Sequence, residues 1–218
     1  MLKASPWAGD LPPALRARVE NETTTRTCPM GSYVCRKGES VEHWIGVVEG
    51  VVKMANVSAD GKPTSFTGIG PGGWFGEGSL LKNEPRRYDI VALRDSTIAS
   101  MPRATFLALL DSSVPFNRHI ITQLNERLGQ FIAMVEHDRL LGPDARLARS
   151  LAGLFHPVLN PGSGPTLPLS QEEMGQLVGL SRQRVNQALN TLERAGLLRV
   201  DYGSVTVLDL PGLRRFAG

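Results

Sequence analysis

Hydrophobic positions in the first half of the chain form short, separate runs. Between about residues 27 and 100 these runs alternate with glycine, proline, asparagine and aspartate. The runs are SYVCR (32–36), WIGVVEG (44–50), VVKMANV (51–57), TSFTGI (64–69), DIVAL (89–93) and STIASM (96–101). Many short strands divided by turn residues are typical of an antiparallel sandwich or barrel. We therefore expect an N-terminal antiparallel β-domain, preceded by a short helix over 12–20.

The period then changes to that of helices. A short helix is predicted over 103–110 and a longer one over about 114–140. In the longer segment, apolar residues recur at 3-4-3-4 spacing, which is the seam of a coiled coil. These residues are Ile121, Leu124, Leu128, Phe131 and Val135. The spacing favours a homodimer with paired helices; the alternative is one helix packed on the neighbouring β-domain.

A hinge is expected at Leu141–Asp144, where glycine and proline interrupt the helical pattern. Asp144 is expected to cap the next helix. The buried face of that helix would consist of Leu147, Leu151 and Leu154. Residues 156–169 are predicted to form a loop with a short strand.

Residues 170–198 predict two short helices joined by a tight turn. Ser170 and Glu173 form the Ser-x-x-Glu pattern of a capping box, Gly179 interrupts the first helix, and Ser181 can cap the second. The second helix would bury Val185, Ala188, Leu189 and Leu192. The next segment alternates around Tyr202-Gly203, which predicts a β-hairpin. A hairpin directly after the second helix defines a winged helix-turn-helix.

The outward face of the second helix carries the chemistry of base recognition. Arg182, Gln183, Asn186 and Gln187 lie on its first turns, and their side chains can pair bidentately with base edges in a major groove. This pattern predicts a DNA-binding helix-turn-helix.

Composition bounds the function further. The chain has 218 residues, a net charge of +3 and no apolar run near 18 residues, so a membrane span is not expected. The first residues lack the apolar block of a secretory signal, and a cytoplasmic protein is predicted. Cys28 and Cys35 match no metal-site spacing and are interpreted as packing residues. The four histidines and the serines show no metal or nucleophile motif, so an enzyme, such as a metal-bearing jelly roll, is the weaker alternative.

The order of these parts resembles the Crp/Fnr family of bacterial transcription regulators. PGGWFGEGSLL (71–81) followed by RRYDIVAL (86–93) looks like a phosphate-binding cassette of cyclic-nucleotide-binding domains, and GLSRQRVNQAL (179–189) matches the family's recognition helix. The resemblance implies an α+β chain with a jelly-roll-like β-roll sensor domain (1–110), a dimerisation helix (111–141) and a winged helix-turn-helix (142–218). It also implies a homodimer on near-palindromic double-stranded DNA, with RNA polymerase as a further candidate partner.

The resemblance also assigns an effector site. The cassette residues are Gly76, Glu77 and Gly78, and Arg87 stands ten residues after Glu77, where the family places the arginine that pairs a cyclic phosphate. Arg86 adds a second cation, Tyr88 replaces the usual hydroxyl residue, and Phe131 stands where adenine-sensing members carry threonine. A cyclic nucleotide such as cyclic AMP, another small ligand, or no effector at all therefore remain open.

The family pattern implies that Arg182, Gln183 and Gln187 read bases, with Ser170 and Gln171 near the DNA backbone and Ser181 at the helix start. Arg182 is expected on guanine, and the two glutamines favour adenine. Arg184 is expected to meet a phosphate or a neighbouring helix rather than a base.

Overall fold

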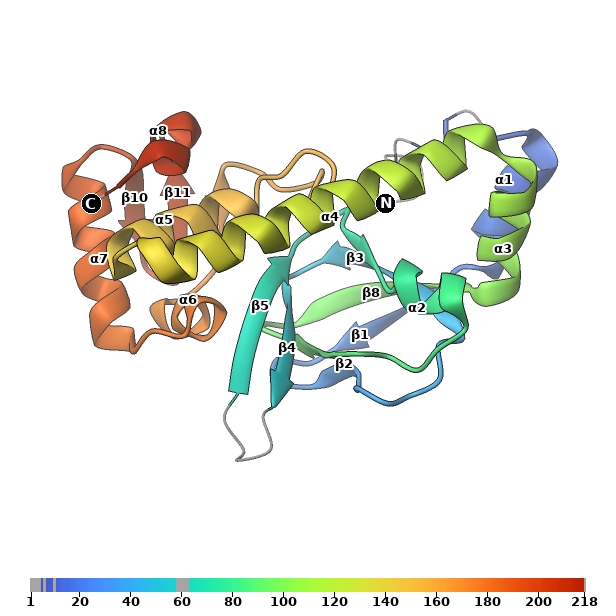
Figure 1. Cartoon of the computed structure of the whole chain (residues 1–218), viewed down its shortest axis with the longest axis horizontal. Coiled ribbons are helices and arrows are strands. Elements are labelled where there is room, and N and C mark those ends of the chain that lie inside the picture. Colours follow the sequence, from blue (N-terminus) through green and yellow to red (C-terminus); the bar gives the residue numbers. More distant parts are fainter. Residues whose placement is uncertain (1–4, 6, 10, 58–62, 218) are drawn as a thin grey trace.

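The computed structural model describes residues 5, 7–9, 11–57 and 63–217. A β-rich domain and a smaller helical domain lie at opposite ends of the molecule, and one long helix, α4 (Val114–Leu140), runs across both (Figure 1). At 1.5 Å per residue, its 27 residues span about 40 Å. The predicted succession of β-domain, long helix and helix-turn-helix is confirmed.

The β-domain is a roll of two four-stranded antiparallel sheets. In spatial order the first sheet contains β1 (Thr24–Cys28), β8 (Ser96–Pro102), β3 (His43–Glu49) and β6 (Trp74–Phe75). The second contains β2 (Tyr33–Cys35), β7 (Asp89–Ala92), β4 (Val52–Val57) and β5 (Pro63–Ile69). Strands β1 and β6 were not expected, because β1 is largely polar and exposed and β6 has only two residues.

Two apolar clusters hold the roll. One lies between the sheets and includes Val47, Phe75 and Ile98. The other contains a group of aromatic rings, in which Trp44 stacks on Trp74 at 4.3 Å between centroids, and Trp7 of the N-terminal segment packs against both. Helices α1 (Pro13–Glu22) and α3 (Arg103–Ser112) cover this end of the roll (Figure 1).

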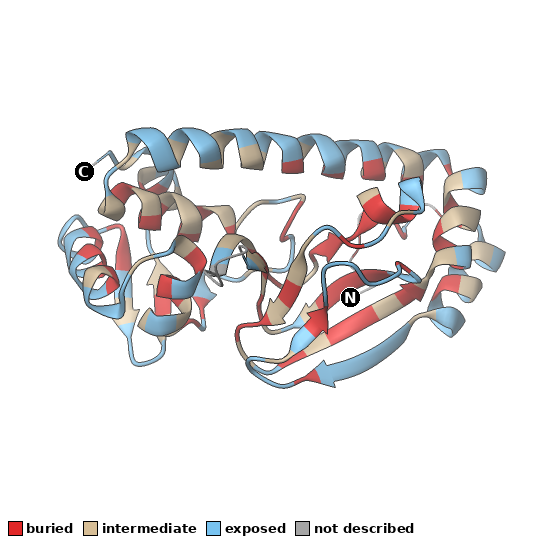
Figure 2. Cartoon of the chain, turned by 60° about the horizontal axis from the view of Figure 1, so that its bottom comes forward, coloured by how far each residue is buried: buried red, intermediate tan, exposed pale blue. Residues whose placement is uncertain are grey.

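Helix α4 has two opposite faces. The face toward the roll buries Phe116, Ile120, Gln123 and Arg127. On the other face a row of apolar side chains is exposed, which Figure 2 shows as an exposed outer edge of the helix. This row, the α4 stripe, consists of Val114, Ile121, Leu124, Leu128, Ile132 and Val135.

One member of the predicted seam is wrong. Phe131 is half-buried against the β-roll, and Ile132, 62% exposed, continues the stripe in its place. The reason is geometric: an α-helix advances about 100° per residue, so a strict 3-4-3-4 pattern drifts off the face of a straight helix.

The C-terminal domain is a winged helix-turn-helix, as predicted. It comprises α5 (Pro143–Gly153), β9 (Thr166–Leu167), α6 (Gln171–Val178), α7 (Arg182–Arg194), β10 (Leu198–Asp201), β11 (Ser204–Val207) and α8 (Leu210–Arg215). Strands β10, β11 and β9 form an antiparallel sheet, and Gly203 (φ +71°) provides the wing turn. The expectation that Asp144 caps α5 is wrong: the N-cap is Gly142, and Asp144 pairs instead with Arg184 of α7.

The two domains are in contact. Val51 and Leu93 of the roll join the apolar core of the C-terminal domain. Asn160, 3% exposed, accepts a hydrogen bond from the backbone N–H of Gly70 at 2.8 Å, and Lys53 donates to Gln176 at 3.1 Å. The turn before the cassette is therefore joined directly to the C-terminal domain.

Candidate functional site

The predicted effector-binding residues of the cassette begin at Gly76, directly after β6. Gly76 adopts φ +93°, a conformation that favours glycine, and the short helix α2 (Glu77–Lys82) follows. Glu77 is only 3% exposed, and its Oε1 lies 3.5 Å from Nε of Arg127 on α4. Arg127 and Gln123 also donate hydrogen bonds to the carbonyl of Trp74, at 3.0 and 3.3 Å. Helix α4 therefore holds both strand β6 and the carboxylate of Glu77.

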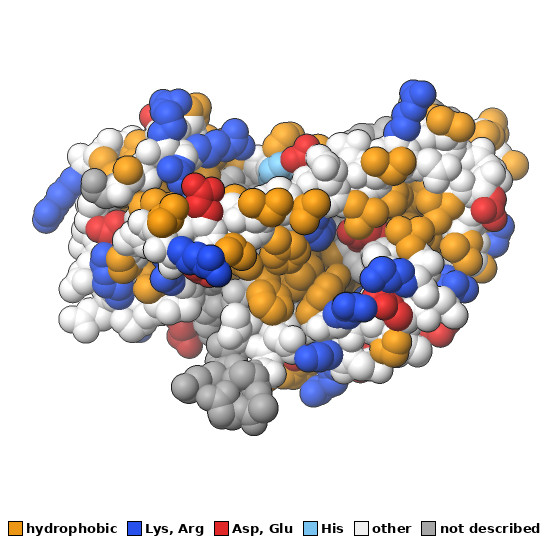
Figure 3. All heavy atoms as spheres, in the orientation of Figure 1, with side chains coloured by type: hydrophobic (Ala, Val, Ile, Leu, Met, Phe, Trp, Pro, Cys, Tyr) orange, Lys and Arg blue, Asp and Glu red, His pale blue; other side chains and the backbone are white. Residues whose placement is uncertain are grey.

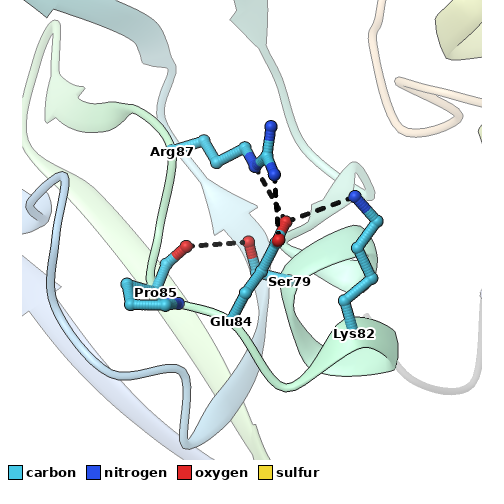
Figure 4. A network of polar contacts seen from close by, with 5 residues as sticks. All are labelled: Ser79, Lys82, Glu84, Pro85 and Arg87. Atoms are coloured by element: carbon cyan, nitrogen blue, oxygen red, sulfur yellow. Dashed lines mark hydrogen bonds and ion pairs between the residues drawn. The ribbon is translucent and has the colours of Figure 1, made fainter.

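The two arginines of the cassette lie in opposite environments. Arg87, the residue expected to bind a phosphate, is exposed and binds Glu84 through two hydrogen bonds of 2.8 and 2.9 Å (Figure 4). This ion pair raises the pKa of Arg87 and lowers the pKa of Glu84. Arg86 is 6% exposed, and a Cβ built on Gly76 would meet its Nη1 at 2.9 Å. Arg86, not Arg87, therefore lies against the cassette glycine.

Tyr88 and Phe131 belong to the apolar wall beside this cluster. Both pack against the core between the sheets, and Phe131 also meets Phe66 edge-on with 6.4 Å between ring centroids. Burial, and secondarily the nearby Glu77 carboxylate, raise the pKa of Tyr88 to about 12. The phenol is therefore neutral near pH 7 and can donate a hydrogen bond. Figure 3 shows hydrophobic side chains gathered beneath α4 in this part of the molecule.

Three buried polar atoms in the cassette and on the facing side of α4 lack a hydrogen-bond partner among the described residues. They are Glu77 Oε2, Arg86 Nη1 and Arg127 Nε. Buried polar atoms are paired in the great majority of cases, so each such atom calls for an explanation. Glu77 Oε2 offers an acceptor and Arg86 Nη1 a cationic donor, whereas Arg127 Nε already lies 3.5 Å from the other carboxylate oxygen of Glu77. That set suits a ligand that carries both hydroxyl groups and an anion. Gly78 lies on α2 with open space around its Cα.

Sequence reasoning missed a cavity between the two domains. It has a volume of about 1120 Å³ and lies between β5, α4, α5 and α6, with Lys53, His137 and Arg149 among its lining. Burial lowers the pKa values of Lys53 and His137. The cavity exists only because the domains pack together, so no local motif in the sequence indicates it.

The helix-turn-helix is capped as the sequence predicts. Ser170 Oγ accepts from the backbone N–H of Glu173 at 3.2 Å, and the Glu173 carboxylate accepts from the N–H of Ser170 at 2.6 Å. Gly179 (φ +67°) ends α6, and Ser181 Oγ accepts from the N–H of Arg184. These caps fix where α7 begins.

The exposed face of α7 presents the predicted reading residues. Arg182, Gln183 and Gln187 are exposed, and their side chains make no hydrogen bond or ion pair with any other residue that the structure describes. Asn186 is also exposed but accepts a hydrogen bond from Gln171 of α6 at 3.3 Å. The structure thus brings together Gln171, Ser181 and the predicted α7 residues on one surface.

Arg184 turns the other way and forms an ion pair with Asp144 of α5. Of the two expectations for this residue, a phosphate or a neighbouring helix, the structure shows the contact with the helix. No described helix is long and apolar enough to cross a membrane. The described residues also hold no group of three or more His, Cys, Asp or Glu side chains that could bind a metal ion.

Family models match both halves of the chain. A cyclic nucleotide-binding domain matches residues 25–113, and a Crp-like helix-turn-helix domain matches residues 145–216. The "Cyclic AMP receptor protein" of Thermus thermophilus is 28% identical over 192 residues, which cover 88% of this chain and 87% of the relative. The "CRP-like cAMP-activated global transcriptional regulator" of Mycobacterium tuberculosis is also 28% identical, over 87% of this chain and 86% of the relative.

Solved structures share the fold. FixK2 from Bradyrhizobium japonicum has a TM-score of 0.69 at 20% identity, over 90% of this chain and 98% of that one. The Thermus thermophilus catabolite activator protein has a TM-score of 0.52 at 25% identity, over 96% and 98%. With both domains matched in order and relatives aligned along most of their length, the chain belongs to the Crp/Fnr family of DNA-binding transcription regulators.

Proposed function

We propose that this regulator works as a homodimer whose long helices pair through the α4 stripe. The observation that carries the proposal is the exposure of the stripe: Ile121 is 67% exposed, Leu128 58% and Ile132 62%. A row of large apolar side chains along one helix face is costly in water and marks an interaction surface. Gly129 is exposed on the same stretch of helix, where a missing side chain permits close approach of a second helix.

Each subunit would then present one α7 helix to the major groove of double-stranded DNA. Arg182 reads guanine, Gln183 and Gln187 favour adenine, and Asn186 lies beside them. Ser170, Gln171 and Ser181 lie at the helix starts, where backbone N–H groups favour a phosphate. Two such helices related by a two-fold axis read half-sites about one helical turn apart, so the operator is near-palindromic. For a protein that acts on DNA in this way, we propose a cytoplasmic location.

The cassette is proposed to bind a small anionic effector that gates DNA binding. Arg86 Nη1 would donate to the anion, and Glu77 Oε2 would accept from a hydroxyl of the ligand. These roles are supported by the burial of both side chains and by their unpaired atoms. Gly76 lets the Arg86 guanidinium approach the backbone of the turn closely, Gly78 has open space beside it, and Tyr88 and Phe131 border the site. The names of the relatives make a cyclic nucleotide, cyclic AMP first, the leading ligand class.

A fluorescence titration tests the effector proposal. All three tryptophans belong to one buried cluster, and the carbonyl of Trp74 accepts a hydrogen bond from Arg127 of α4, which also pairs with Glu77 of the cassette. Binding of cyclic AMP, cyclic GMP or a cyclic dinucleotide at the cassette should therefore change tryptophan emission, and calorimetry would give the affinity. If none of these ligands changes the emission or releases heat, and the dialysed protein still binds DNA fully, the result would favour an effector-independent regulator instead.

A further inference from the structure

The first turn of α7, the proposed DNA-reading helix, carries positive charge where a helix usually favours negative charge. It contains Arg182 and Arg184 and no acidic residue. The N-terminus of a helix already has positive potential from its aligned peptide dipoles, and anions, not cations, stabilise it. An acidic side chain from another part of the chain would therefore stabilise the start of α7, whose own first turn supplies none.

Asp144 supplies that group from another helix. It is the last residue of the predicted hinge and lies in the first turn of α5, and its Oδ1 forms an ion pair with Nη2 of Arg184. The side chains are 24% and 31% exposed respectively, and Oδ1 itself has no contact with solvent. The pair is thus more shielded than a surface salt bridge, and it holds the guanidinium of Arg184 against α5.

We propose that Asp144 is an intramolecular competitor of the DNA backbone: by binding Arg184 it withholds one phosphate contact from each subunit and so lowers the affinity for DNA. A phosphate oxygen and the Asp144 carboxylate are alternative anions for the same guanidinium at the same helix start. This inference rests on the proposed docking of α7 on DNA. Asp144 would affect DNA binding through the position of Arg184, whereas the base-reading residues contact the DNA themselves.

Counterion release gives the size of the expected effect. Each new phosphate contact steepens the plot of log affinity against log salt concentration by about 0.9 for duplex DNA. Over the tenfold step from 1 M to 0.1 M salt, a slope of about 0.9 amounts to an increase in affinity of about eightfold for one such contact. Asp144→Asn should therefore bind a 30-base-pair duplex of random sequence about eightfold more tightly per engaged subunit, with a slope steeper by about 0.9.

Three further variants make the experiment decisive. Arg184→Gln should leave the slope at the wild-type value, because Arg184 is already occupied by Asp144. The double variant Asp144→Asn/Arg184→Gln should return the slope of the single Asp144→Asn variant to the wild-type value. Asp138→Asn is the matched control: Asp138 pairs with Arg146 at 3.7 Å near the same hinge, so it removes one negative charge without freeing Arg184.

The outcomes separate this inference from the proposed function. An unchanged slope in folded Asp144→Asn, an equal steepening in Asp138→Asn, or a shallower slope in Arg184→Gln overturns the competitor role alone. A wild-type chain that binds no duplex at all overturns the proposed DNA recognition and this inference with it. Circular dichroism of each variant confirms that the helices are intact. The double variant is a second control, because a slope changed by loss of stability would not return to the wild-type value when Arg184→Gln is added.

Discussion

Replacing the two cassette arginines separately tests the effector site most sharply, because sequence spacing and structure assign the phosphate contact to different residues. The spacing from Glu77 points to Arg87, but that side chain is exposed and bound to Glu84. Arg86 is buried against Gly76 with Nη1 unpaired. Arg86→Gln should therefore weaken effector binding strongly, and Arg87→Gln should leave it nearly unchanged.

The magnitude follows from the burial of Arg86. A hydrogen bond that involves a charged group contributes about 1.5–3 kcal/mol, so Arg86→Gln should raise the dissociation constant roughly 10- to 150-fold. Arg86→Lys keeps the charge but loses the planar fork, and it should recover only part of the affinity. Arg87→Gln breaks an exposed pair and should change the affinity less than about twofold.

Isothermal calorimetry with the tightest-binding cyclic nucleotide measures these affinities directly. Thermal unfolding without ligand controls for folding, since Arg86 also donates to the backbone carbonyl of His43 at 3.2 Å. A larger loss of affinity in Arg87→Gln than in folded Arg86→Gln or Arg86→Lys would refute the assignment of the phosphate contact to Arg86.

Further predictions concern the dimer seam, the recognition helix and the buried phenol. Leu128→Glu should give monomers in sedimentation velocity, whereas Thr122→Glu, exposed on the flank of α4, should leave the dimer intact; a dimeric Leu128→Glu protein would contradict the seam. Arg182→Ala should cost about 1–3 kcal/mol of operator binding and relax selection for guanine at one position; unchanged selection would contradict its reading role. Ser170→Ala removes the cap of α6 and should lower the free energy of unfolding by about 1 kcal/mol in urea titrations. Burial raises the pKa of Tyr88 in the folded state to about 12 from 10; the unfolded chain therefore loses this proton first, and the free energy of unfolding falls between pH 10 and 12 by up to about 1.4 kcal/mol per pH unit. Tyr88→Phe should reduce that fall, and identical pH profiles of the two proteins would show that the phenol is not buried.

Local patterns predicted what local interactions determine. The capping box at Ser170, the break at Gly179 and the wing turn at Gly203 depend on residues a few positions apart, and all are present in the structure. The succession of short strands also followed from alternating apolar runs. Strand β1 escaped notice because four of its five residues are exposed, so it carries no apolar signal and is held by pairing with β8.

Long-range contacts account for what the sequence could not predict. Which cassette arginine turns inward depends on the carbonyl of His43 and on the close approach of Gly76, neither of which is visible in the spacing. The partnership of Asp144 with Arg184 joins residues 40 positions apart on two helices. The exchange of Phe131 for Ile132 in the stripe depends on how α4 lies across the roll, since both residues are apolar and adjacent in the sequence.

Selection of binding sites from a pool of random DNA duplexes tests the central claim most directly. The account predicts that the purified chain enriches a near-palindromic site whose half-sites lie about 10 base pairs apart and each contain a guanine. Enrichment should be lost when Arg182, Gln183 and Gln187 are replaced together by alanine. A pool that stays random after repeated rounds with folded, dimeric protein would contradict sequence-specific recognition by α7.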